Sequence, residues 1–132
     1  MTEHKYIHNT QHRDGNPNKS QWIIGFADEE EIWNNTPYSI NYLCYGLYIQ
    51  YDKPHYLGFP AKISPSPLKK LFIAKFRGSP DGTFISWHGY PADTTLKVQD
   101  RPSEEYLNEW IRKNYISPAQ ASKILKGKKC YL

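Results

Sequence analysis

Two apolar runs joined by a turn constrain this chain more than any other feature. Between Leu68 and Asp93 it reads LKKLFIAKFRGSPDGTFISWHGYPAD. Apolar and polar residues alternate along both runs, so that Phe72, Ala74 and Phe76 share one face, a period of two that is typical of a strand rather than a helix. The Gly-Ser-Pro-Asp-Gly sequence between the runs is typical of a four- or five-residue hairpin loop. We therefore predict a β-hairpin.

The second run ends in side chains that could carry chemistry. The imidazole of His88 titrates near neutral pH when unperturbed, so it could act as a general base or acid. Tyr90 or Asp93 could orient it, since functional groups often lie where a strand gives way to a loop. The plainer interpretation is that Trp87 belongs to the core and the residues after Gly89 form only a turn.

The rest of the chain predicts one α+β domain at residues 21–132, preceded by a mobile arm at residues 1–20, which has few apolar residues. We expect an antiparallel sheet of about four to five strands, with two C-terminal helices packed on one face. Outside the hairpin, the expected elements are strands at 21–26, 38–51 and 55–63, a helical turn at 28–33, a helix at 104–114, and a helix that begins at Pro118 and ends at Gly127.

The two C-terminal helices have clear capping signals. Ser103 precedes two glutamates, and Ser117 forms a capping box with Gln120. The segment from Ile116 to Gly127 resembles the opening helix of a helix-turn-helix unit. Only five residues follow Gly127, too few for a recognition helix, so DNA recognition does not follow from this resemblance. The main seam is expected to join Trp110, Ile111, Ile124 and Leu125 to Phe72 and Phe76.

Charge is distributed unevenly along the chain, whose formal net charge is +4. Residues 1–34 are net acidic, whereas residues 35–100 and 101–132 are net basic. A basic surface suits a polyanion or an acidic protein partner. The residues expected to bind nucleic acid or a partner are Lys75, Arg77, Trp87, Lys123, Lys126, Lys128 and Lys129.

Several classes of protein are disfavoured. No apolar run approaches the length of a membrane span and no secretory signal is evident, so we expect a cytoplasmic protein with no membrane contact. Cys44 and Cys130 are then expected to be reduced thiols. His4, His8 and His12 recur every four residues, as a metal-binding helix face would, but nothing caps such a helix. We expect no metal and no cofactor.

Three functions remain open, and binding ranks above catalysis. The first is a small binding protein for RNA or single-stranded nucleic acid, in which lysines neutralise phosphates and exposed aromatic rings stack on bases. The alternative is a protein-partner modulator, such as an inhibitor, an immunity protein, or an antitoxin-like or phage-encoded factor. The third is a small metal-independent nuclease using His88, although the predicted hairpin places Arg77 near Thr83, several residues from His88.

Overall fold

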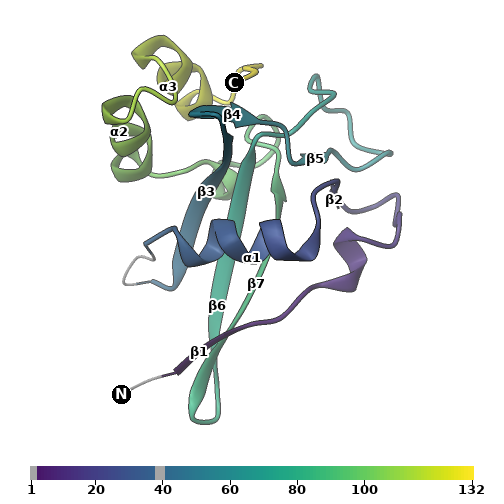
Figure 1. Ribbon diagram of the computed structural model, residues 1–132. Helices are drawn as coiled ribbons and strands as arrows, with labels where there is room; N and C mark the ends of the chain where they lie inside the picture. The colour runs from purple at the N-terminus through teal and green to yellow at the C-terminus, as the bar shows by residue number, and fades with distance from the viewer. Residues whose placement is uncertain (1–2, 38–40) are drawn as a thin grey trace.

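The computed structural model describes residues 3–37 and 41–132, which form a mixture of helices and strands (Figure 1). The elements are β1 (Glu3–Tyr6), η1 (Thr10–His12), β2 (Gln21–Trp22), α1 (Phe26–Asn34), β3 (Leu43–Gln50), β4 (Lys53–His55), β5 (Gly58–Phe59), β6 (Ile73–Asp81), β7 (Phe84–Ala92), η2 (Val98–Asp100), α2 (Glu104–Arg112) and α3 (Pro118–Leu125), where η marks a 3-10 helix. The larger sheet has the order β1-β7-β6-β3-β4, and β2 pairs with β5.

The predicted β-hairpin is confirmed, but its loop is shorter than expected. β6 and β7 pair all the way from Ile73 to Asp81, which lies opposite Phe84, and only two residues form the turn. The first of these is Gly82, whose φ of +65° is typical of glycine at the first position of a type II′ turn. Proline has no N–H to donate to a neighbouring strand, so it is tolerated only where one edge of its strand is unpaired. Pro80 meets this condition, because β3 pairs with β6 only as far as Arg77 and β7 is the only described neighbour beyond that point.

The prediction of an entirely antiparallel sheet was wrong. β1 lies parallel to β7, with Glu3 opposite Phe84 and Tyr6 opposite Trp87, whereas the other described neighbours are antiparallel. A parallel pair needs a long connection rather than a tight turn, and here the intervening chain supplies it. Because β1 is only four residues long, local alternation could not reveal it.

Other predicted strands are shorter in the structure. The strand expected at 21–26 is confined to β2, because Gly25 is already the N-cap of α1. The strand expected at 55–63 is replaced by the short β4 and β5, since Pro60 directly follows β5. The strand expected at 38–51 is confirmed over β3, while residues 38–40 lie outside the described residues.

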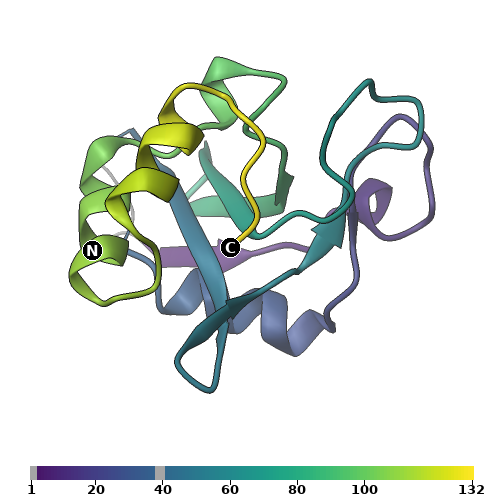
Figure 2. The ribbon, with the colours of Figure 1, turned by 90° about the horizontal axis from the view of Figure 1, so that it is seen from above.

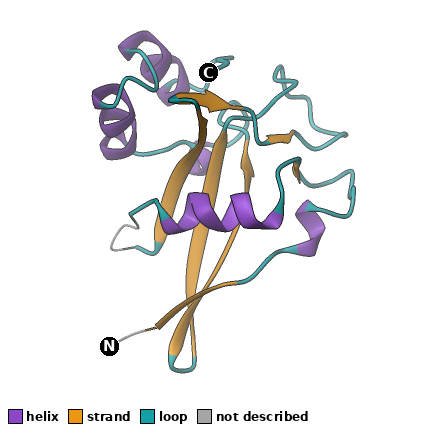
Figure 3. Ribbon diagram, in the orientation of Figure 1, coloured by secondary structure: helices purple, strands orange, loops and turns teal. Residues whose placement is uncertain are grey.

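Successive side chains of the central strands point to opposite faces of the larger sheet, and an apolar cluster lies on each face. Phe76 packs with Trp87 and with Ile32 of α1 on the first face, while Ile73 packs with Trp110 of α2 on the second. Figure 2 shows α1 on one side of the strands and α3 on the other, and Figure 3 shows the same layers by element type. The second cluster is completed by Tyr45, Leu47, Ala92, Leu107, Ile116, Ala121 and Ile124.

The helices therefore differ from the prediction in number and placement. α2 and α3 share one face, but α1 covers the other. The expected seam was wrong because Phe76 points to the α1 side, opposite to Ile73, as alternate residues of a strand must. Leu125 is exposed, and Phe72 lies next to Tyr131 near the C-terminus instead of beneath the helices.

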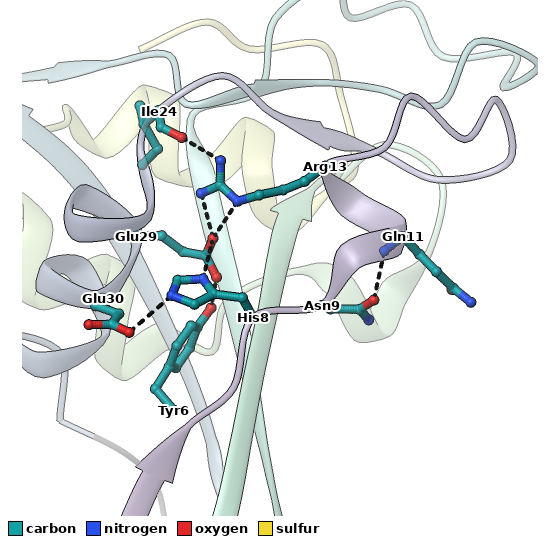
Figure 4. A network of polar contacts seen from close by, with 8 residues as sticks. All are labelled: Tyr6, His8, Asn9, Gln11, Arg13, Ile24, Glu29 and Glu30. Atoms are coloured by element: carbon teal, nitrogen blue, oxygen red, sulfur yellow. Dashed lines mark hydrogen bonds and ion pairs between the residues drawn. The ribbon is translucent and has the colours of Figure 1, made fainter.

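From Glu3 onward, the N-terminal segment is joined to the sheet and to α1, although its composition predicted a mobile arm. The central group is Glu29, whose carboxylate is buried. Its Oε1 accepts hydrogen bonds from Arg13 Nη2 at 2.6 Å and Nε at 3.2 Å, and its Oε2 accepts one from the Tyr6 hydroxyl. Figure 4 shows these groups together with His8, whose Nε2 lies 3.0 Å from Glu30 Oε1. The arm is thus fastened to α1 by a buried ion pair.

Candidate functional site

Two residues predicted to bind a ligand are inaccessible. Trp87 is 0% exposed, and its indole N–H donates to His4 Nδ1 at 2.9 Å. Lys75 is 4% exposed, and its ammonium donates to Asp100 Oδ1 at 3.1 Å and to the Gln99 carbonyl at 2.7 Å. Neither a base nor a phosphate can reach these side chains in this structure, so we leave both out of the site.

Lys75 belongs to a polar network beneath η2. The Tyr90 hydroxyl donates to the same Asp100 oxygen at 2.5 Å, and the Tyr45 hydroxyl donates to the Gln99 carbonyl at 3.0 Å. Burial, followed by the hydrogen bond to Asp100, raises the pKa of Tyr90 well above its usual value. Tyr90 therefore stays a protonated donor at neutral pH, and its hydroxyl holds Asp100 in place.

Tyr90 and Asp93 line a cavity of about 480 Å³ whose histidine is His12 rather than His88. The rings of His12 and Tyr90 stack with centroids 5.2 Å apart. His12 Nδ1 lies 2.8 Å from the Ser20 carbonyl, an arrangement that requires a proton on Nδ1, and burial lowers the pKa of His12. Asp93 Oδ1 accepts two hydrogen bonds from Thr95, while Oδ2 has no partner among the described residues.

His88 lies elsewhere, directly opposite Arg77 on the paired strands. The expectation that Arg77 would be several residues away was wrong, because the turn lies at Gly82 and Thr83, later in the chain than predicted, and this changes the register of the two strands. Among residues 3–37 and 41–132, no carboxylate or hydroxyl is hydrogen-bonded to His88, so the predicted grouping of His88 with Tyr90 and Asp93 is not formed. A nuclease that uses His88 stays a prediction.

The three N-terminal histidines do not converge. His4 contacts Trp87, His8 lies against Glu29 and Glu30, and His12 stacks on Tyr90. Within the part of the chain that the structure describes, no group of three or more His, Cys, Asp or Glu side chains is placed to hold a metal ion.

A row of aromatic rings with lysines beside it joins the chain around β5, the residue before β6 and the C-terminal tail. Figure 1 shows β4, β5 and the C-terminus at the same end of the sheet. Neighbouring ring centroids are 6.2 Å apart for Tyr131 and Phe72, 6.4 Å for Phe72 and Tyr56, and 6.0 Å for Tyr56 and Phe59. We call this row, together with the nearby Lys69, Lys70 and Lys129, the aromatic–lysine strip.

Specific contacts hold the strip together. Lys129 Nζ lies 5.4 Å from the centre of the Tyr131 ring, and Lys70 Nζ lies 4.6 Å from that of Tyr56. The Tyr131 hydroxyl accepts a hydrogen bond from the Lys69 backbone N–H at 2.8 Å, which joins the C-terminal residues to the chain before β6. Tyr131 and Phe59 remain 40% and 43% exposed, so the two ends of the row present ring surface to solvent.

The chain segments that form the strip contain no acidic residue. Residues 53–72 carry four lysines and residues 117–132 carry four. The predicted ligands Lys123, Lys126, Lys128 and Lys129 are all exposed at the end of α3 and just beyond it. Lys123 also acts on the Cys130 thiol, lowering a pKa that burial raises. The ammonium groups of Lys70 and Lys129 therefore give the strip its positive charge.

Of the strip residues, only Lys129 was among the predicted ligands; Lys69, Lys70 and the four rings were not. Tyr56 and Phe59 stand in the segment expected to be an edge strand, and Tyr131 stands in a short tail. Phe72 was expected in the hairpin, packed against the C-terminal helices. The signal that could have found these rings is the occurrence of large aromatic residues within the two segments that contain lysine and no acid.

Fold and surface together define a small α+β protein with a basic surface that carries exposed aromatic rings. Comparison of the chain with models of protein families, with curated proteins and with solved structures finds no match. In the described part of the chain, every helix is too short or too polar to cross a membrane.

Proposed function

We propose that this protein binds single-stranded nucleic acid, either RNA or single-stranded DNA, along the aromatic–lysine strip. The observation that carries the proposal is the continuous row of four rings with ammonium groups beside two of them. Proteins that bind single strands without reading sequence combine a positive groove with rings on which bases stack.

Each part of the strip has a distinct expected role. The exposed rings of Phe59 and Tyr131 supply stacking surfaces, which every base can use because every base has a π face. Lys69, Lys70 and Lys129 neutralise phosphates, and the resulting release of counterions makes affinity depend on salt. A duplex does not offer its bases to stacking, so the strip should prefer single strands.

The first test is fluorescence anisotropy with labelled twelve-nucleotide oligouridine and oligothymidine, and with a duplex of the same length. If about four phosphates are neutralised, the affinity for a single strand should fall about 50-fold between 50 and 200 mM salt. Equal affinity for duplex and single strand, or an affinity independent of salt, would contradict the proposal.

The second test removes a ring that contributes little to the core. Phe59→Ala should weaken single-strand binding by about 1–3 kcal/mol, since this is the usual effect of deleting one stacked ring. The control is Tyr51→Ala, because Tyr51 is 94% exposed and lies outside the strip. If both variants bind like the parent protein, stacking on this strip is refuted.

The third test concerns charge. Lys70→Gln should lower the slope of log affinity against log salt by about 0.7, because one phosphate contact is lost. Lys97→Gln is the matched control, since Lys97 is an exposed lysine beside the His12 cavity and not part of the strip. A larger change of slope for Lys97→Gln than for Lys70→Gln would move the interface away from the strip.

A further inference from the structure

A groove of about 460 Å³ lies between α1 and α2, and β3 forms its floor. Its floor and walls include the apolar side chains of Leu47, Ile49, Trp110 and Tyr115. It is separate from the aromatic–lysine strip, because none of the strip residues lines it. We call it the β3 groove.

One edge of β3 is open within this groove. β6 pairs with β3 from Leu43 to Leu47, and β4 pairs with Tyr48 to Gln50. In an antiparallel pair, the N–H and C=O groups of every second residue point toward the partner strand. Gly78 N–H donates to the Tyr42 carbonyl at 2.9 Å, so Tyr42 points its backbone groups toward β6. Tyr45 and Leu47, at odd-numbered positions, therefore point theirs away from β6. No described strand lies beside them there, and such an edge is a template for another extended chain.

The rims of the groove are acidic. α1 contributes Asp28 and Glu31, and α2 contributes Glu105 and Glu109. Lys113 is the one basic residue in the lining, and its Nζ already lies 3.5 Å from Glu109 Oε1. Burial and then the carboxylates of Asp28 and Glu31 raise the pKa of Tyr48, which agrees with a negative potential along the groove.

We propose that the β3 groove binds an extended, basic segment of a partner protein, which adds to β3 as a further strand. In this mode of recognition the main-chain hydrogen bonds supply affinity, and alternate side chains supply specificity. Apolar side chains of the segment would face Leu47 and Trp110, while its lysines or arginines would meet the carboxylates on both rims. Nucleic acid is excluded as the occupant because those carboxylates repel phosphate.

The probe is the labelled peptide Lys-Val-Lys-Val-Lys-Val-Lys, with both ends blocked, titrated by anisotropy and followed by shifts of the backbone amides of Tyr45 and Leu47. Two matched peptides separate the contribution of charge from that of main-chain hydrogen bonds. The glutamate counterpart, which reverses the charge, should not bind. The lysine peptide N-methylated at alternate residues keeps its charge but loses main-chain donors, and its affinity should fall about tenfold or more.

The matched protein variants are Glu31→Gln/Glu109→Gln and the control Glu3→Gln/Glu104→Gln. Both remove two acids, but Glu3 and Glu104 do not line the groove. The first variant should weaken binding of the lysine peptide about three- to tenfold, as expected for two partly exposed ion pairs, and the control should leave it unchanged. Equal urea midpoints would show that both variants are folded.

Three results would overturn the proposal. One is failure of the lysine peptide to bind at millimolar concentration, and another is equal affinity of its N-methylated form. The third is a dimer, detected by sedimentation, that dissociates in the Glu31→Gln/Glu109→Gln variant and not in its control. This result would make a second copy of the chain the occupant in place of a separate partner.

Discussion

The buried ion pair between Arg13 and Glu29 offers a sharp test of how the N-terminal segment is held. Glu29 is 1% exposed, and Arg13→Met would remove both guanidinium hydrogen bonds to its Oε1. Removing one partner of a buried pair typically costs about 3–5 kcal/mol. Because the Tyr6 hydroxyl would still donate to Oε2, we expect a loss of about 3 kcal/mol, a large share of the ~5–15 kcal/mol that stabilises a typical domain.

The assay is equilibrium unfolding in urea, applied to Arg13→Met, Glu29→Gln and the double variant. The double variant should be at least about 2 kcal/mol more stable than the sum of the single losses predicts, because it leaves no uncompensated carboxylate. The control is Arg112→Met, which removes one partner of the exposed Arg112–Glu109 pair and should leave the urea midpoint unchanged. If Arg13→Met costs no more than Arg112→Met, or if the two losses simply add, the buried pair does not fasten the segment.

Three further predictions concern the core and pH. Burial raises the pKa of the Cys44 thiol to about 12. Above pH 9 the thiolate therefore forms first in the unfolded chain, and the free energy of unfolding should fall by about 2 kcal/mol at pH 10.5. The stability of Cys44→Ala in urea should depend less on pH over this range. Burial lowers the pKa of His12, so the unfolded chain is protonated first and stability is lost as pH falls below about 6.5. His12→Phe keeps the ring stack, and its melting temperature should fall less over the same pH range. Phe76→Ala should cost about 3–5 kcal/mol in urea, since Phe76 is 0% exposed, and a loss below 1 kcal/mol would contradict its place in the core.

Features that depend on neighbouring residues were predictable. The alternation around Phe76 predicted the hairpin, and the capping box of Ser117 with Gln120 is present at the start of α3. The helix expected at 104–114 is α2, and the helical turn expected at 28–33 is part of α1. In each case the physical cause acts within a few residues of the chain, so a single sequence contains it.

Features that depend on distant residues were not predictable in this way. Lys75 was expected to bind a ligand, but its partner Asp100 stands 25 residues away in the sequence, and the pair allows the ammonium to be buried. The parallel pairing of β1 with β7 and the contact between Phe72 and Tyr131 are of the same kind. No local sequence pattern indicates which distant segment will pair with a given residue or strand.

The distribution of charge in the folded protein differs from its distribution along the sequence. Glu105 and Glu109 belong to a segment with a net positive charge, yet the fold places them opposite Asp28 and Glu31. Lys129 of the same segment lies beside Tyr131 in the strip. The net charge of +4 therefore divides into a basic surface and an acidic groove with no lining residue in common. If both proposals hold, the two sites should respond to different substitutions: Phe59→Ala should bind the lysine peptide like the parent protein, and Glu31→Gln/Glu109→Gln should still bind oligouridine. Loss of peptide binding in Phe59→Ala, or loss of oligouridine binding in Glu31→Gln/Glu109→Gln, would mean that both ligands use one surface, and the division of charge would then have no functional meaning.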